Sequence, residues 1–373
     1  MTEKMRITGD HWFGLLGKLV VALCLLPMIA VAVAALSGGF DTIVSLSQSV
    51  LPRYVGATLQ LSVIVGLGTA VIGTGAAWLV TMTRFFGRRV LEIALALPLA
   101  FPAYVLAYAY TDLLDHPGLV QSTLRAFMGW GPRDYWFPEI RSLGGAAAML
   151  VLVLYPYVYL LARAAFLRQS ATAYIAARTL GQGPWGAFWR VSLPVARPAI
   201  AGGVLLALME TLADYGTTAY FGVQTFATGI YVSWFGLFDR AAAAQLALCL
   251  LVVALTLATF ERRQRRNSRH HDAGRRFEVM EPVTLNGRAA LGAILFCGLP
   301  VLFGFVLPVW ILITLAADQA HILFTDRYLG FLRHSLTLAA IAAFLTVGAA
   351  IALGFRTRLR PTPMSKTALR VAG

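Results

Sequence analysis

The chain has 373 residues, of which 58% are hydrophobic and only 13% are charged, and its formal net charge is +14. This balance excludes a disordered protein, which needs low hydrophobicity and high charge, and it disfavours a single soluble domain, in which about a quarter of the residues are charged. We therefore expect an all-α membrane protein that crosses the bilayer several times.

Eight apolar segments follow one another along the chain, and each is long enough to cross roughly 30 Å of hydrocarbon as a helix. We interpret the first as a retained helix rather than a cleaved signal peptide, because it is long and no small-residue cleavage site precedes the next loop. The predicted fold is a polytopic helical bundle with about eight transmembrane helices. The predicted spans are residues 14–36, 57–80, 90–111, 143–162, 199–220, 241–260, 289–315 and 335–355.

Basic residues near the ends of the spans predict the orientation, because Lys and Arg stay on the cytoplasmic side. If the N-terminus is cytoplasmic, 24 of the 31 Lys and Arg residues lie inside. We therefore predict a cytoplasmic N-terminus and outside loops at about residues 37–55, 112–142 and 217–240.

The inside segment 163–198 has the most regular pattern of any predicted loop. Helical periodicity runs through residues 174–180 and again through 185–191, and Gly181, Gly183 and Pro184 separate the two stretches. Glycine commonly ends a helix, and proline suits the first turn of the next one. The segment therefore predicts two short amphipathic helices with a bend, on the cytoplasmic face. Three aromatic side chains on the second helix are of the type enriched at protein interfaces, namely Trp185, Phe188 and Trp189.

This segment resembles the EAA loop of ATP-binding-cassette (ABC) importer permeases, in which Glu-Ala-Ala is followed by a glycine and then by Ile-x-Leu-Pro at fixed spacing. The chain departs from that pattern at Ile175, where the family usually has Glu. The resemblance implies a fold like that of type I ABC importer permeases and a loop that couples the permease to a cytoplasmic ATPase. An amphipathic helix resting on the membrane surface is the alternative. The residues assigned to the coupling loop are Ala176, Ala177, Gly181, Gly183, Pro184, Trp185, Val191, Leu193 and Pro194.

The segment 210–246, with its runs ETLADYGT, TFATGIY and DRAAAAQL, is similar to permeases of the ferric-iron, binding-protein-dependent group. That resemblance implies a permease of the bacterial inner membrane that works with an ATPase dimer and a periplasmic substrate-binding protein. Related branches carry thiamine, phosphonates, sulfate or molybdate, so ferric iron is one of several expected substrates.

Two acidic residues, Glu210 and Asp214, fall within the predicted span 199–220. Their i, i+4 spacing would place both on one helix face, and a carboxylate in a span is costly unless it faces protein or water. One interpretation is that they line the translocation path, where hard oxygen ligands suit a hard cation such as ferric iron. The other is helix packing, with Glu210 bonded to a neighbouring helix and Asp214 capping the break at Gly216.

A basic segment at 261–276 follows the sixth span. We interpret it as a solvated loop that touches anionic lipid headgroups, and we expect no nucleic-acid partner because no aromatic residue interleaves the basic run. After this segment an internal repeat begins, since residues 328–358 repeat the pattern of residues 54–84. We predict a first permease half at 1–260, a basic cytoplasmic linker at 261–288, and the start of a second, incomplete half at 289–373, with truncation favoured over a naturally short chain.

The sequence contains no phosphate-binding G-x-x-x-x-G-K-[ST] run, no nucleophile elbow and no H-E-x-x-H pattern. We therefore predict no catalytic residue, no metal site and no cofactor, and we expect ATP hydrolysis in a partner chain. Two other functions stay open. One is a secondary transporter that uses Glu210 and Asp214 as an ion site, and the other is an inactive or scaffolding remnant of a longer permease.

Overall fold

The computed structural model describes residues 19, 22–23, 25–132, 134–169, 175, 177, 179–266, 282–317 and 325–359. The described residues are almost entirely helical, apart from two strands of two residues each, so the predicted all-α class is confirmed. Contacts divide the chain into two units, residues 1–39 with 315–373, and residues 40–314.

The unit formed by the two ends of the chain contains a helix at Leu25–Ser37 and the long helix α16 (Asp326–Leu359). Part of the predicted first span lies outside the described residues. No side chain in the span Asp326–Ile351 is buried. Helix α16 begins at Asp326, before residue 335, where the predicted span 335–355 starts.

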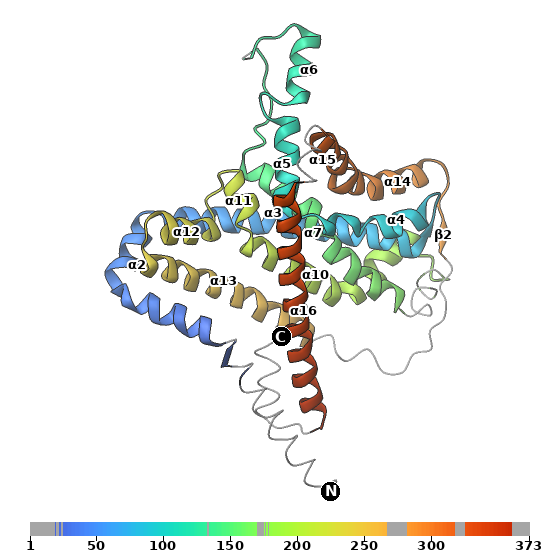
Figure 1. The fold of residues 1–373 in the computed structure, drawn as a ribbon. Coiled ribbons are helices and arrows are strands. Elements are labelled where there is room, and N and C mark those ends of the chain that lie inside the picture. Colours follow the sequence, from blue (N-terminus) through green and yellow to red (C-terminus); the bar gives the residue numbers. More distant parts are fainter. Residues whose placement is uncertain are drawn as a thin grey trace. The chain divides into compact units, whose positions relative to one another are not determined.

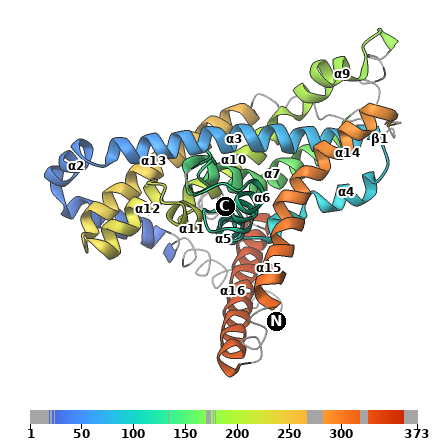
Figure 2. The same cartoon turned by 90° about the horizontal axis from the view of Figure 1, so that it is seen from above.

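Three helices form the centre of the larger unit, α3 (Leu51–Met82), α7 (Leu143–Leu167) and α10 (Leu193–Ala213). Figures 1 and 2 both show α3 running through this unit, with α2 (Gly39–Gln48) at one end and α4 (Arg88–Ala94) at the other. The helices approach closely at glycines, which is how membrane helices gain packing contacts without a hydrophobic driving force.

The contact of α3 with α7 is tightest at Gly73. A Cβ atom added at Gly73 would lie 2.7 Å from Val158 Cβ and 2.8 Å from the carbonyl oxygen of Tyr155. On the other face of α7, a Cβ added at Gly203 of α10 would lie 2.6 Å from Val158 Cα. These three atoms are backbone atoms or a Cβ of α7, so none of them can move unless the helix itself shifts.

We predict that Gly73→Ala destabilises the protein by about 1–3 kcal/mol, because the added methyl overpacks the α3–α7 contact. The measurement is the midpoint of thermal aggregation of the detergent-purified chain. Gly56→Ala in the same helix is the matched control, since a Cβ at Gly56 meets no atom within 4 Å. Equal midpoints for the two variants would contradict the prediction.

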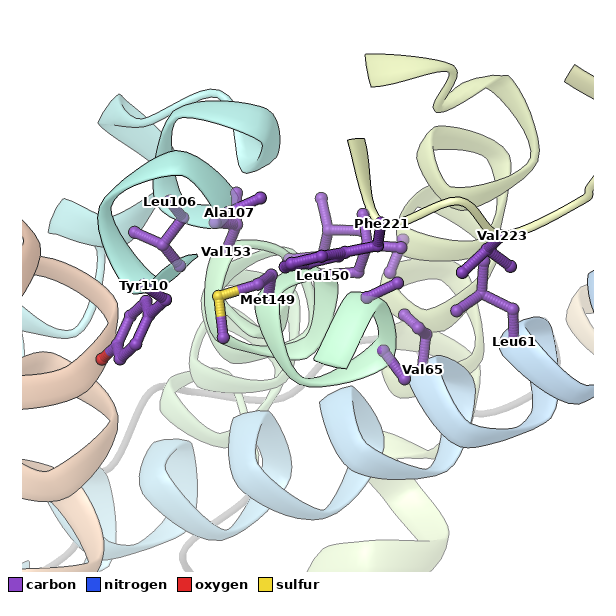
Figure 3. Packing of buried hydrophobic residues seen from close by; sticks show 14 residues of the cluster. Leu61, Val65, Leu106, Ala107, Tyr110, Met149, Leu150, Val153, Phe221 and Val223 are labelled. Carbon is purple, nitrogen blue, oxygen red and sulfur yellow. The ribbon is translucent and has the colours of Figure 1, made fainter. Parts of the chain in front are cut away.

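A hydrophobic cluster joins four parts of this unit (Figure 3). It fixes α5 (Ala103–Leu114) and the stretch after α11 (Gly216–Tyr220) against the central helices. The labelled members are Leu61 and Val65 of α3, Leu106, Ala107 and Tyr110 of α5, Met149, Leu150 and Val153 of α7, and Phe221 and Val223 beyond α11.

The predicted span 90–111 is broken by a sharp bend. The chain forms α4, a short 3-10 helix (Leu97–Ala100), α5 and α6 (Leu119–Met128), with a bend of 93° between the helical stretches on either side of Phe101. Phe101 is extended, with φ −98° and ψ 133°, because the ring of Pro102 disfavours the helical conformation of the preceding residue.

The predicted span 199–220 is wrong at both ends. The helix is continuous from Trp185 to Ala213 and stops at Asp214, after which α11 begins separately.

Six helices of the described residues are long and apolar enough to cross a membrane, or up to eight if each bent pair is one span, in agreement with the predicted number. The remaining helices are α12 (Phe226–Tyr231), α13 (Arg240–Arg266), α14 (Gly287–Val301) and α15 (Leu307–Ala317), with π-helical turns at Val232–Gly236 and Leu302–Val306.

A strand pair brings two predicted inside segments together. Strand β1 (Thr83–Arg84) pairs in parallel with β2 (Val283–Thr284), and the Leu285 amide donates a hydrogen bond of 2.9 Å to the Arg84 carbonyl oxygen. The turn after α3 and the stretch before α14 therefore share one end of the larger unit. Residues 267–276 of the basic segment lie outside the described residues.

Candidate functional site

The bend predicted in segment 163–198 is made by Gly181, whose φ of +81° lies in the left-handed region. The Gln182 amide donates a hydrogen bond of 3.0 Å to the Ala177 carbonyl oxygen, five residues back. This pattern ends a helix and satisfies one of its last carbonyl groups, and glycine makes it without steric cost. Ala176 lies outside the described residues.

The helix after the bend begins at Pro184, as α9 (Pro184–Ala187), and continues through a π-helical turn at Phe188–Ser192 into α10. The predicted separate short helix at 185–191 is therefore wrong. Pro194 lies in the first turn of α10 and lacks an amide hydrogen, and the wider π turn before it accommodates its ring without ending the helix. Of the other predicted coupling residues, Gly183 is exposed, whereas Val191 and Leu193 are half-buried.

Aromatic contacts hold this helix against α3. Trp78 of α3 lies 5.0 Å from the ring of Phe188 and 6.1 Å from the ring of Trp185, measured between centroids. Phe188 is only 6% exposed, so the prediction that it anchors a partner is wrong, because its ring packs into the core instead. Trp185 and Trp189 contact the Phe188 ring at its edge of the core, but 62% and 52% of their surfaces stay exposed.

We predict that Trp78→Leu speeds amide hydrogen exchange over residues 185–192 by about tenfold, because each lost aromatic contact removes roughly 1 kcal/mol from the local opening free energy. Trp130→Leu is the control, since Trp130 stacks on Tyr135 elsewhere in the chain. Unchanged exchange in the Trp78 variant would mean that the contacts do not hold the segment.

Asp214 lies just beyond the end of α10 and caps α11. Its carboxylate accepts hydrogen bonds from the Thr217 amide at 3.0 Å, the Thr218 amide at 3.1 Å and the Thr217 hydroxyl at 2.9 Å. Both threonines are fully buried. The packing interpretation of Asp214 therefore describes its contacts, whereas the predicted common helix face with Glu210 stays a prediction.

Glu210 differs from Asp214 in its exposure and in its hydrogen bonds. It lies within α10 on a face that also exposes Leu206 and Met209. It makes no hydrogen bond or ion pair with the residues that the structure describes, so the predicted bond to a neighbouring helix is not found there. A carboxylate within a membrane span is costly unless it faces water or protein.

One continuous span, Trp185–Ala213, joins the predicted coupling segment to Glu210. At about 1.5 Å per residue, Trp185 and Glu210 are roughly 35–40 Å apart along the helix. The exposed tryptophans and the carboxylate therefore belong to one continuous helix backbone. This link was not predicted, because the predicted loop 163–198 ends where the predicted span 199–220 begins. Among the described residues, no group of three or more His, Cys, Asp and Glu side chains could hold a metal ion.

Comparison with known proteins gives one consistent family. The model of the binding-protein-dependent transport system inner membrane component family matches residues 63–266. The Fe(3+)-transport system permease protein FbpB 2 of Haemophilus influenzae is 25% identical over 352 residues, which are 92% of this chain and 64% of that protein. The molybdenum transport system permease protein ModB of Escherichia coli K12 is 30% identical over 166 residues, which are 44% of this chain and 69% of that protein.

The fold is also that of a solved transporter subunit. A chain in the crystal structure of a bacterial alginate ABC transporter, in complex with a periplasmic protein that binds alginate pentasaccharide, matches with a TM-score of 0.58 at 21% identity. The match covers 72% of this chain and 98% of that one. This chain spans just under two thirds of the length of FbpB 2, and a larger share of the two other proteins.

Proposed function

Because this chain belongs to the family of binding-protein-dependent transport system inner membrane components, we propose that it is the permease subunit of an ABC importer, driven by a separate ATPase. The observation that carries the proposal is the continuous helix from Trp185 to Ala213, which begins at the bend at Gly181 and carries Glu210 near its far end. Such a helix couples a motion at one end to the translocation path at the other.

In this proposal the ATPase dimer docks on the exposed surface around Gly181, Trp185 and Trp189. ATP binding closes the dimer and moves that surface, and α10 tilts with it. A ligand or partner shifts a conformational equilibrium only by its differential affinity for the two states, so the docked ATPase must bind the inward and outward states differently. A periplasmic binding protein delivers the substrate on the other side, at the loops after α5 and α11. The N-terminus is cytoplasmic, as the distribution of basic residues predicts.

We propose ferric iron as the substrate. The similarity to FbpB 2 extends over 92% of this chain, whereas that to two molybdenum permeases covers 44% and 67%. Glu210 supports a cation further, since an unpaired carboxylate on the path repels an oxyanion and supplies the hard oxygen that a ferric ion prefers. We also propose that residues 1–260 form one permease half, 261–288 the linker and 289–373 the beginning of a second half.

The test is reconstitution of the full chain in proteoliposomes with candidate ATPase and binding-protein subunits. We expect ATP hydrolysis that rises when the iron-loaded binding protein is added, and no rise with molybdate- or sulfate-loaded proteins. Uptake driven by an ion gradient without any ATPase would instead support a secondary transporter. Absence of both activities with every subunit combination would support a scaffolding remnant.

A further inference from the structure

A basic hollow lies at the end of α3, and its lining includes neither the residues around Gly181 nor Glu210. It has a volume of about 700 Å³ and is lined by the turn after α3 and the first residues of α4. Its charged lining residues are Arg84, Arg88, Arg89 and Glu92.

The carboxylate of Glu92 does not neutralise these arginines. It forms an ion pair with Arg163 in the last turns of α7, and the Tyr159 hydroxyl donates a hydrogen bond of 2.7 Å to the Glu92 carbonyl oxygen. None of the three other arginines has a side-chain hydrogen bond or ion pair with the residues that the structure describes. The hollow therefore carries about three uncompensated positive charges.

The backbone holds these arginines in place. Arg84 belongs to the strand pair with Val283–Thr284, and Gly87, with φ +77°, turns the chain back so that α4 starts beside it. The Arg88 amide donates to the Phe85 carbonyl oxygen at 3.4 Å, and the Leu91 amide donates to the Gly87 carbonyl oxygen at 3.0 Å. The Nε atom of Arg88 is buried and has no hydrogen-bond partner among the described residues.

Apolar side chains are exposed beside the same arginines. Phe86 is 90% exposed, and Val90 and Ile93 of α4 are each 72% exposed. The hollow also lies at the end of α3, and its Glu92 pairs with Arg163 near the end of α7; both helices are long and apolar enough to cross a membrane. The end of a membrane span lies at the level of the lipid headgroups. Arginine and aliphatic or aromatic groups together match a molecule that has both a phosphate and a hydrocarbon chain.

We propose that this hollow binds one anionic phospholipid, whose phosphate contacts Arg84, Arg88 and Arg89 and whose upper acyl chains cover Phe86, Val90 and Ile93. A free phosphate ion satisfies the arginines but leaves the apolar side chains in water. An acidic protein surface satisfies the arginines too, but three such apolar side chains around them favour lipid.

The test is a titration of the full chain in neutral detergent with fluorescent phosphatidylglycerol and, separately, with phosphatidylcholine. We expect the wild-type protein to prefer phosphatidylglycerol, and the double variant Arg84→Gln/Arg89→Gln to lose roughly tenfold or more of its affinity for that lipid, given the usual contribution of a basic residue near an anionic headgroup. Both residues are exposed, so the double variant is expected to fold, which its thermal aggregation midpoint checks.

The matched control is Arg327→Gln/Arg333→Gln in α16, which removes the same charge from two exposed arginines outside the hollow and should change the affinity by less than about twofold. An unchanged preference in the Arg84/Arg89 variant would overturn the proposal. Displacement of phosphatidylglycerol by millimolar inorganic phosphate would overturn it in favour of a free anion. Normal lipid binding in that variant with loss of ATPase association would overturn it in favour of a protein surface. None of these readouts depends on transport.

Discussion

Gly181→Asp is expected to reduce ATP-dependent uptake by roughly tenfold or more while membrane abundance stays within about twofold of the wild type. The backbone at Gly181 has φ +81°, where a residue with a Cβ costs about 1–2 kcal/mol. That cost is local and small compared with the stability of the whole bundle. A Cβ at Gly181 meets no atom within 4 Å, so the new carboxylate projects outward, onto the surface where we propose that the ATPase docks.

The matched control is Gly287→Asp, at the end of the larger unit where β1 and β2 pair. Gly287 also has a positive φ, of +55°, and no atom lies within 4 Å of an added Cβ. The two substitutions therefore impose similar backbone strain and the same charge. Equal loss of uptake in both variants would show that strain or charge in general is responsible, and normal uptake in Gly181→Asp would remove the coupling assignment.

Glu210→Gln is expected to lower cation uptake by about tenfold, because it removes the negative charge that we propose lines the path, at a cost of roughly 1–2 kcal/mol in substrate binding. The amide has the same shape as the carboxylate, and Glu210 has no hydrogen bond to lose with the described residues, so abundance should not change. The measurement is iron uptake by proteoliposomes, normalised to the amount of inserted protein.

Asp214→Ala provides the contrast four residues further along the chain. It removes three hydrogen bonds and leaves the buried hydroxyl of Thr217 without its partner, which should cost about 1–3 kcal/mol of stability. We expect reduced abundance, with near-normal uptake per inserted molecule. If both variants lost uptake and abundance in parallel, Glu210 would be a packing residue and the proposed path would lie elsewhere.

The contacts of these two carboxylates go beyond what their spacing predicts. Their i, i+4 spacing predicted one helix face, but it did not predict that α10 ends at Ala213. The helix ends at Ala213 because Asp214 can cap the buried threonines that follow, and that alternative depends on Thr217 and Thr218 being enclosed by distant parts of the chain.

Two prolines show the same dependence on distant parts of the chain. Pro102 does break its span, because the extended Phe101 before it is compatible with the surrounding packing. Pro194 does not break its helix, since a π turn absorbs it and Phe188 in that turn is held by Trp78 of α3. A proline has the same local preferences at both places, and only the neighbours from elsewhere in the chain differ.

The sequence by itself determined the helical class, the number of apolar spans and the helix-ending turn at Gly181. Each of these depends on the transfer of a contiguous segment into lipid or on residues within one or two helical turns. The tertiary structure alone decided that Phe188 points into the core and that α10 ends between Glu210 and Asp214. It also decided that one helix joins the bend at Gly181 to Glu210, and that Arg163 neutralises Glu92 and leaves a basic hollow. These outcomes depend on which distant side chains share a neighbourhood, and close packing of helices, rather than any local preference, makes that choice.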